Sequence, residues 1–257
     1  MSYALITGGS KGIGKAIAYY LAEKKINLLL VARSESLLKE VSIALRNNFR
    51  IDVKYLCVDL AGENAAEIIF EWVRTQNVTV NILINNAGYG LSGGFEKYSA
   101  SSHAEMMHVN MVSLVKLTSL FLPMLKQQLR SYILNIASNA AYQAVPYLGT
   151  YAASKSFVVS FSRALQYELR KTNVSVTCVS PGGANTDFGT RANIGRRAIK
   201  AGEKFNMEPD EVAAIAVKAM FKKRKEVVVG FVNRIGAFLV WLTPKGLSER
   251  VAAKLYE

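Results

Sequence analysis

Short apolar runs alternate along this chain with longer stretches in which apolar residues recur at helical spacing. Runs of this length, bounded by polar or glycine-rich segments, predict buried strands. The predicted strands cover residues 3–7, 27–33, 51–58, 80–84, 132–137, 174–179 and 226–230. The predicted helices cover residues 16–25, 35–47, 65–75, 102–128, 150–171 and 208–221. The second run is nearly all aliphatic, as in a parallel sheet covered on both faces, and the alternation predicts an α/β fold.

The stretch 102–128 is apolar around most of its circumference and predicts a long helix. Pro123 is expected to bend or interrupt it, because proline lacks a backbone N–H donor. Asn110 lies among apolar neighbours, so it is either a satisfied structural amide or part of a site. His103 and His108 have no partners at metal-ligand spacing, so we interpret both as surface or packing residues and expect no metal.

Composition indicates a single domain with a sizeable core. The chain has 257 residues, of which 51% are hydrophobic and 20% charged. Lysine and arginine total 32 against 19 acidic residues, a net charge of +13. Such an excess can indicate nucleic acid, an anionic membrane surface or acidic ligands. The cations are mostly dispersed, without a zinc spacing or an aromatic–basic RNA signature, so we expect no nucleic-acid partner.

The two cysteines, Cys57 and Cys178, each lie inside an apolar strand-like run. Widely separated single cysteines of this kind predict core residues in a reduced protein. Met1 leads at once into the first predicted strand, which leaves no room for the regions of a signal peptide. We therefore expect a cytoplasmic protein.

A glycine-rich turn joins the first predicted strand to the first helix: Thr7-Gly8-Gly9-Ser10-Lys11-Gly12-Ile13-Gly14. Strand, glycine turn and helix in this order predict a nucleotide site, because the backbone can approach a pyrophosphate at the positive end of the helix. A generic glycine-rich turn is the alternative.

The second predicted strand ends in Ala32-Arg33-Ser34, where an acidic residue would bond the adenosine ribose hydroxyls. Arg33 and Lys11 aimed at the same ribose favour the phosphorylated cofactor, NADPH. The alternative is that Arg33 merely faces solvent.

Three further turns follow predicted strands: Asp59-Leu60, Asn85-Asn86-Ala87-Gly88-Tyr89-Gly90 and Ser180-Pro181-Gly182-Gly183-Ala184-Asn185-Thr186. The aspartate could bond an adenine amino group or simply cap the next helix. Small residues and amides would let a flat ring lie against the backbone, but an ordinary polar turn has the same composition.

Tyr151 and Lys155 are four residues apart, so they share one face of a helix. A lysine beside a tyrosine stabilises the phenolate and lowers a pKa that is otherwise about 10, which suits the pair to proton transfer. Ser138 lies at the carboxyl end of a predicted parallel strand, where open α/β sheets bind ligands. A solvated helix turn would explain Tyr-x-x-x-Lys equally well by itself.

Two segments near the C-terminus carry no such motif. Residues 187–207 contain no long apolar run but several cations, which fits a lid over a pocket. Those cations could meet an acidic substrate arm or keep a loop solvated.

Residues 235–242 are apolar all round, and Leu247, Val251 and Leu255 then predict a short amphipathic helix. The apolar run is too short to span a membrane. We favour a tail that packs on its own domain or on a partner subunit. The alternative is a tail that lies in a membrane interface, with Trp241 as an anchor.

Taken together and in this order, the motifs Thr7-Gly8-x-x-x-Gly12-x-Gly14, Asn85-Asn86-Ala87-Gly88, Asn110, Ser138, Tyr151-x-x-x-Lys155 and Pro181-Gly182 resemble the short-chain dehydrogenase/reductase family. The resemblance covers residues 1–230 and implies a single Rossmann-type, doubly wound domain with a seven-stranded parallel sheet, followed by a tail over residues 231–257.

The resemblance also implies roles. Tyr151 would protonate a carbonyl oxygen as hydride leaves the nicotinamide, and Lys155 would lower its pKa and hold the ribose hydroxyls. Ser138 would bond the reacting oxygen, and Asn110 would position a water that links Lys155 to solvent. Asp59 would contact adenine, and Thr186 the nicotinamide carboxamide. The expected NADP(H)-binding set is Gly8, Ser10, Lys11, Gly12, Ile13, Gly14, Arg33, Asp59, Leu60, Asn86, Ala87, Gly88, Tyr151, Lys155, Pro181, Gly182 and Thr186.

For the substrate, the chain is similar to a bacterial branch of broad-specificity or unassigned reductases, and at a distance to long-chain 3-ketoacyl and 17β-hydroxysteroid reductases. This implies a hydrophobic carbonyl or alcohol, such as an acyl thioester, and a homodimer or homotetramer. The expected substrate contacts are Ser138, Tyr142, Tyr147, Tyr151 and Phe188, although Tyr142, Tyr147 and Phe188 could equally be core residues. Two other functions stay open: an NADPH-binding regulator without turnover, and a membrane-surface protein whose tail is the functional part.

Overall fold

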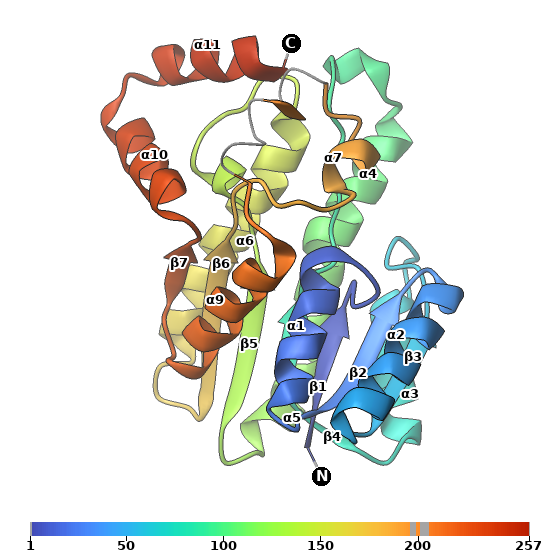
Figure 1. Ribbon diagram of the computed structural model, residues 1–257. Coiled ribbons are helices and arrows are strands. Elements are labelled where there is room, and N and C mark those ends of the chain that lie inside the picture. The colour runs from blue at the N-terminus through green and yellow to red at the C-terminus, as the bar shows by residue number, and fades with distance from the viewer. Residues whose placement is uncertain (1, 196–198, 201–205, 257) are drawn as a thin grey trace.

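A parallel sheet forms the centre of the molecule (Figure 1). The computed structural model describes residues 2–195, 199–200 and 206–256. Within them the strands are β1 (Ser2–Thr7), β2 (Asn27–Ala32), β3 (Val53–Cys57), β4 (Thr79–Asn85), β5 (Ser131–Ile136), β6 (Val174–Ser180) and β7 (Glu226–Val228). Their order is β3-β2-β1-β4-β5-β6-β7, with every pairing parallel. The predicted doubly wound domain with a seven-stranded parallel sheet is confirmed.

Helices cover both faces of this sheet. One face packs against α1 (Gly12–Glu23), α2 (Glu35–Phe49) and α9 (Pro209–Phe221), and the other against α3 (Ala65–Thr75), α5 (Ser113–Lys126) and α6 (Gly149–Glu168). Successive side chains of a strand point to opposite faces. In β1, Ala4 and Ile6 therefore join one apolar cluster, while Tyr3 and Leu5 join the other. Burial on both faces explains why the strands read as continuous apolar runs.

The predicted helix 102–128 is divided, and the division is not at Pro123. Helix α4 (Ala100–Met107) passes through a π-helical turn, His108–Val112, into α5. Pro123 lies inside α5 near its end and does not interrupt the helix, while the alternative that it bends the helix stays a prediction. The π turn holds Asn110, and such turns often occur at functional sites. Among the described residues, the stretch Ala100–Lys126 is the helix long and apolar enough by composition to cross a membrane.

Cys57 does not lie in the core. Its side chain is exposed, and its Sγ donates to the carbonyl oxygen of Arg33 at 3.2 Å. The reason is that β3 is the edge strand of the sheet, so its last residue has a neighbouring strand on one side only. Cys178, on the interior strand β6, is buried as predicted.

The C-terminal segment forms two helices beyond β7. Helix α10 (Phe231–Leu242) leaves the last strand, and α11 (Lys245–Tyr256) returns across the end of the molecule opposite the N-terminus (Figure 1). Helix α7 (Phe188–Arg191) lies within the predicted lid 187–207. The remaining lid cations Arg196, Arg197 and Lys204 lie outside the described residues.

Candidate active site

The carboxyl ends of β1, β4, β5 and β6 meet at one edge of the sheet, and the strand order reverses between β1 and β4. In open α/β sheets, ligands bind where the order reverses in this way. The turns that follow these four strands carry most of the predicted site residues, so the fold brings them to one edge.

The glycine turn after β1 has the shape of an anion cradle. Gly8 and Gly12 have φ values of 67° and 50°, in the left-handed region that favours glycine. A Cβ on Gly14 would collide with the carbonyl oxygen of Gly8 and the side chain of Asn86. Helix α1 begins at Gly12 with no side-chain cap and no acidic residue in its first turn. Its first N–H groups and positive dipole end therefore fit a pyrophosphate, beside Ser10 and Ile13 of the same turn.

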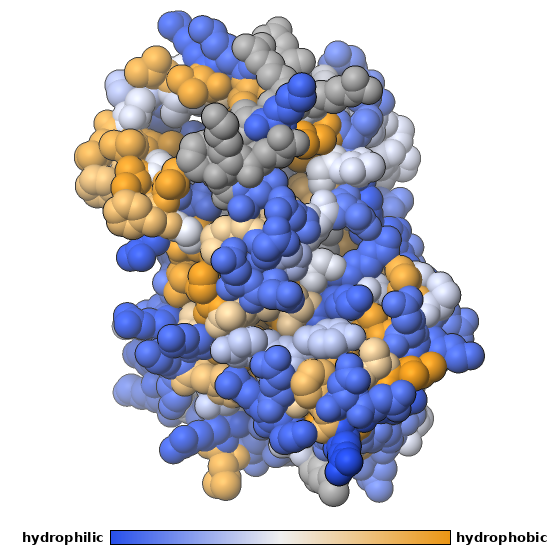
Figure 2. Space-filling view, in the orientation of Figure 1, coloured by the Kyte–Doolittle hydropathy of each residue, from blue (hydrophilic) through white to orange (hydrophobic). Residues whose placement is uncertain are grey.

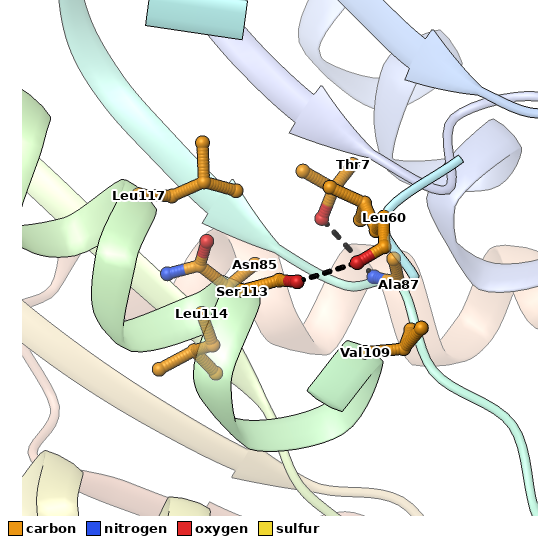
Figure 3. A pocket seen from close by; sticks show the side chains of 8 residues that line it. All are labelled: Thr7, Leu60, Asn85, Ala87, Val109, Ser113, Leu114 and Leu117. Carbon is orange, nitrogen blue, oxygen red and sulfur yellow. Dashed lines mark hydrogen bonds between the residues drawn. The ribbon is translucent and has the colours of Figure 1, made fainter. Parts of the chain in front are cut away.

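Asn86 and Thr7 join this turn to the end of β4. The Asn86 Nδ2 donates to the carbonyl oxygens of Thr7 and Gly8 at 2.9 and 3.3 Å. The Thr7 Oγ1 accepts from the backbone N–H groups of Asn86 and Ala87 at 3.0 and 3.1 Å, the latter bond drawn in Figure 3. The predicted residues Asn86 and Ala87 are thus held against the glycine turn. Thr7 performs this positioning although we did not include it among the site residues.

Leu60 is positioned from another helix. The Ser113 Oγ on α5 donates to the Leu60 carbonyl oxygen at 2.7 Å, across a small cavity lined by Thr7, Asn85 and Ala87 (Figure 3). Asp59 accepts from the N–H of Ala61 at 3.0 Å. The segment after β3 is therefore fixed beside the turn after β4.

Both cations predicted to select NADPH are paired with carboxylates. The Arg33 Nη1 lies 3.3 Å from the Asp59 Oδ2, and the Lys11 Nζ lies 3.1 Å from the Asp187 Oδ2. All four side chains are about half exposed or more, and ion pairs so exposed contribute only about 0–1 kcal/mol. A phosphate could therefore replace either carboxylate at little cost.

Asn110, in the π turn, is fully hydrogen-bonded. Its Oδ1 accepts from the N–H of Tyr89 at 3.1 Å, and its Nδ2 donates to the Tyr89 carbonyl oxygen at 2.9 Å and the Ser154 Oγ at 3.0 Å. The side chain therefore joins the turn after β4 to helix α6. The role in positioning a water stays a prediction.

Lys155 is buried, with 4% of its surface exposed, and its Nζ donates to the carbonyl oxygen of Ile136 at 2.9 Å. Burial lowers the pKa of Lys155 to about 8. A Cβ on Gly88 would lie 3.1 Å from this Nζ and 3.0 Å from the Asn110 Oδ1. The turn after β4 therefore passes directly over the lysine and the asparagine.

Tyr151 lies one helical turn before Lys155, as the spacing predicted, and is also buried. Burial raises the pKa of Tyr151 to about 12, while a hydrogen bond with Ser138 opposes the rise. The Lys155 Nζ is 5.8 Å from the centre of the tyrosine ring. The expected lowering of the Tyr151 pKa by Lys155 is thus not what this structure has, because desolvation dominates and the ammonium faces Ile136. At neutral pH the phenol is protonated and can donate a proton.

The turn after β6 closes the site from the other side. The N–H of Asn139 donates to the carbonyl oxygen of Pro181 at 2.8 Å. A Cβ on Gly12 would lie 3.1 Å from the Thr186 methyl group, so Thr186 lies against the glycine turn. A Cβ on Gly182 would collide with Asn233 of α10.

Of the three aromatic residues predicted to contact substrate, Phe188 lies beside Tyr151, with ring centres 5.2 Å apart. The Tyr142 hydroxyl donates to Glu226 at 2.7 Å and is 3.0 Å from the Ser180 Oγ, and its ring packs against a different apolar cluster. Tyr147 has a left-handed backbone, with φ of 63°. The structure thus brings Phe188 and Tyr151 together without Tyr142.

An apolar cluster of side chains surrounds Tyr151, and the C-terminal helix forms part of it. Ala252 and Tyr256 of α11 belong to the same cluster as Tyr151 and Phe188. The other members are Tyr89, Leu91, Met106, Ala140, Val145, Leu148 and Ala152. We did not predict these contacts. The sequence carries no signal for them, since Ala252 and Tyr256 each lie only one position after a residue of the predicted apolar stripe.

The glycine cradle, the helix pair Tyr151 and Lys155, and Ser138 at the end of β5 occur here in one site. The sequence profile of the short chain dehydrogenases matches residues 2–197. The chain belongs to the short-chain dehydrogenase family. The family resemblance drawn from the motifs is confirmed.

Known members of this family resemble the chain along much of its length. An uncharacterized oxidoreductase of Staphylococcus saprophyticus is 30% identical over 217 residues, 84% of this chain and 90% of that protein. Mouse 17-beta-hydroxysteroid dehydrogenase type 3 is 29% identical over 91% of this chain and 76% of its own length. Human very-long-chain 3-oxoacyl-CoA reductase is 32% identical over 70% of this chain, but only 58% of that protein is matched. The predicted distant similarity to these reductases is confirmed.

Among solved structures, a short-chain dehydrogenase from Sphingobium yanoikuyae in complex with NADPH has a TM-score of 0.83 and 28% identity, over 96% of this chain and 95% of that one. This chain is therefore an oxidoreductase of the short-chain dehydrogenase type.

Proposed function

We propose that this short-chain dehydrogenase uses NADPH to reduce a hydrophobic ketone, or NADP⁺ to oxidise the corresponding secondary alcohol. The observation that carries the proposal is the buried, protonated Tyr151, which lies among apolar side chains, near Ser138 and one helical turn from Lys155.

The dinucleotide supplies the hydride when bound, and the chain handles the proton. Tyr151 donates its phenolic proton to the carbonyl oxygen as the carbonyl carbon gains hydride, and is left as a phenolate. Ser138 bonds the reacting oxygen beside it. The Lys155 ammonium, mostly charged at pH 7 and fixed by the Ile136 carbonyl oxygen, would hold the ribose hydroxyls of the dinucleotide. In the direction of alcohol oxidation, the same residues act in reverse.

Preference for the phosphorylated cofactor rests on Lys11 and Arg33, which lie beside the glycine turn and after β2, and on the lack of an acidic residue at the end of β2. The NADPH complex of the Sphingobium relative supports this choice. The glycine cradle and the uncapped start of α1 fit the pyrophosphate of either nicotinamide cofactor.

The substrate class rests on the apolar side chains around Tyr151. Beyond Tyr151 and Ser138, these side chains are mainly aliphatic and aromatic. Such surroundings favour a ketone with a large apolar body, and the names of the two relatives suggest a 3-oxoacyl thioester or a steroid-like ketone. We also propose a cytoplasmic location and a homodimer or homotetramer.

The test follows NADPH oxidation with 3-oxoacyl thioesters of rising chain length, steroid ketones and small diketones. We expect turnover with the larger apolar ketones and a fall of about 10²–10⁴-fold in Tyr151→Phe. Tyr167→Phe, an exposed position on the same helix, is the matched control. Tight NADPH binding by calorimetry without turnover of any ketone would favour a cofactor-binding regulator instead.

A further inference from the structure

Helix α10 turns its large apolar side chains to solvent. Its exposed apolar side chains Phe231, Ile235, Phe238 and Leu242 recur at helical spacing and form one stripe, which Val232 and Leu239 widen. None of its twelve residues is buried. The polar Asn233, in contrast, faces the domain, where its Oδ1 accepts from the Asn139 Nδ2 at 3.2 Å. The helix is therefore fixed to the domain at Asn233, and its large apolar side chains are turned to solvent.

Helix α11 repeats this arrangement. Ala252 is buried and Tyr256 packs towards Tyr151, whereas Leu247, Val251 and Leu255 form an exposed stripe one turn apart. Figure 2 shows apolar residues gathered over the region of α10 and α11. We call the exposed apolar side chains of these two helices the tail face: Phe231, Val232, Ile235, Phe238, Leu239, Trp241, Leu242, Leu247, Val251 and Leu255.

Aromatic rings and cations stand next to the tail face. Trp241 is 78% exposed and stacks on Phe238, with ring centres 6.2 Å apart. The cations of the two helices are Arg234, Lys245, Arg250 and Lys254, against the one acid Glu249 within residues 231–256. In the described part of the chain, none of these four cations forms an ion pair. Exposed aromatic and aliphatic side chains with unpaired cations beside them are what an anionic lipid interface binds.

The cations beside the tail face favour a lipid surface over a second copy of the chain as the partner that covers it. A second copy docked on this face would cover the apolar side chains but would bring two sets of unpaired cations together, and like charges at an interface are unfavourable. The chain as a whole also carries a net charge of +13. An anionic bilayer surface satisfies both the apolar stripe and the cations.

We propose that the tail face binds an anionic lipid surface, with α10 and α11 lying in the plane of the headgroups. Helix α10 has 12 residues, so its length is only about 18 Å, well short of the about 30 Å of a bilayer core. It would therefore lie on the membrane rather than cross it. Because Ala252 and Tyr256 of α11 also pack in the apolar cluster around Tyr151, the bound lipid surface would lie beside the substrate site.

The test measures sedimentation with vesicles of phosphatidylcholine alone and of phosphatidylcholine mixed with phosphatidylglycerol. We expect the wild-type protein to bind the mixed vesicles and not the neutral ones. Phe238→Ser with Trp241→Ser should lose about tenfold or more in affinity. The matched control, Ile68→Ser with Leu129→Ser, removes two exposed apolar side chains outside the tail face and should bind like the wild type.

A second pair of variants tests the cations. Arg250→Gln with Lys254→Gln should weaken binding about fivefold for each cation removed, and less at high salt. Lys39→Gln with Lys218→Gln, exposed lysines on α2 and α9, should have a much smaller effect. Trp72 and Trp241 are the two tryptophans of the chain, so Trp72→Phe leaves Trp241 as a single probe. Its emission should shift to the blue on mixed vesicles.

Each contrary result is recognisable. Equal binding by the tail-face variant and its control would overturn the proposal, as would a wild-type protein that binds neither vesicle. Light scattering that shows an oligomer, dissociated by Phe238→Ser with Trp241→Ser and without vesicle binding, would identify a second copy as the occupant. Vesicle binding does not depend on turnover, so failure of the proposed reductase activity would leave this test unaffected.

Discussion

The ammonium nitrogen of Lys155 donates a hydrogen bond to the carbonyl oxygen of Ile136, 2.9 Å away and two residues before Ser138. The lysine is thus positioned by the backbone of β5, the same strand that delivers the serine. Its buried charge is costly, since burial lowers the pKa of Lys155 to about 8 from its ordinary 10.5. The buried ammonium therefore lowers the stability of the folded protein, but it gives the site a cation at a fixed position.

Lys155→Met should raise the free energy of unfolding at pH 7 by about 2 kcal/mol while abolishing turnover. Below about pH 8 the native wild type keeps a buried ammonium, which methionine removes. Between about pH 8 and 10.5 the unfolded lysine still binds a proton that the native one has lost, so wild-type stability rises with pH. Denaturant unfolding across this pH range should show that the difference in the free energy of unfolding between variant and wild type becomes smaller as the pH rises. A constant gap, or an equal gain from Lys39→Met on exposed α2, would contradict this account.

Arg33→Asp should weaken NADPH binding about 10–100-fold and NADH binding far less, because it removes a cation at the expected 2′-phosphate and adds a repelling carboxylate. Calorimetry with both cofactors measures the ratio of the NADPH and NADH dissociation constants in each variant. Lys39→Asp, which makes the same change of charge at an exposed position of α2, is the comparison and should leave the binding of both cofactors unchanged. Equal losses of NADPH and NADH in Arg33→Asp would remove the basis for the phosphate preference.

Tyr256→Ala should raise KM for bulky apolar ketones several-fold with little change in kcat, because it removes apolar contacts near Tyr151 and leaves the proton donor in place. A small ketone should be reduced as by the wild type. Steady-state kinetics with a large and a small ketone measures KM and kcat separately for each. Tyr167 on α6 is 68% exposed, and Tyr167→Ala is the control. A uniform fall in kcat for both ketones would instead indicate that Tyr256 supports Tyr151 itself.

Gly14→Ala should abolish cofactor binding, since the added methyl group collides with the Gly8 carbonyl oxygen and Asn86. Gly149→Ala, at the start of α6, meets nothing within 4 Å and should leave binding unchanged. Fluorescence titration with NADPH gives the comparison, with circular dichroism to confirm that both variants fold. Retained binding in Gly14→Ala would show that the turn can move away from the pyrophosphate.

Local patterns predicted those parts of the site that depend on a single element. The four-residue spacing of Tyr151 and Lys155 fixes their shared helix face, and the glycines after β1 fix the turn. Contacts between distant segments were not predictable in the same way. Nothing near Tyr256 in the sequence indicates that α11 returns to Tyr151, and the exposure of Cys57 depends on which strand forms the sheet edge.

The pKa of Tyr151 shows a second limit. The helix spacing correctly places a lysine beside the phenol, but the sign of the shift depends on burial and on where the ammonium points. Both are properties of the packed structure. Likewise, the sequence did not predict the π turn within residues 102–128. The residues of that turn are as apolar as those of the α-helices on either side, so the stretch predicts one continuous helix.

The π turn also sets the phase between the two halves of that helix. Its wider turn holds one more residue than an α turn, so it takes up that residue without rotating α4 relative to α5. Removing one residue between 108 and 112 would leave an ordinary α turn, and Met106 and Leu117 would still face the core. Asn110 would lose its alignment with Tyr89, because its place in the turn would change. A sequence alignment that places a gap in this turn would therefore pair residues that occupy the same faces of the molecule.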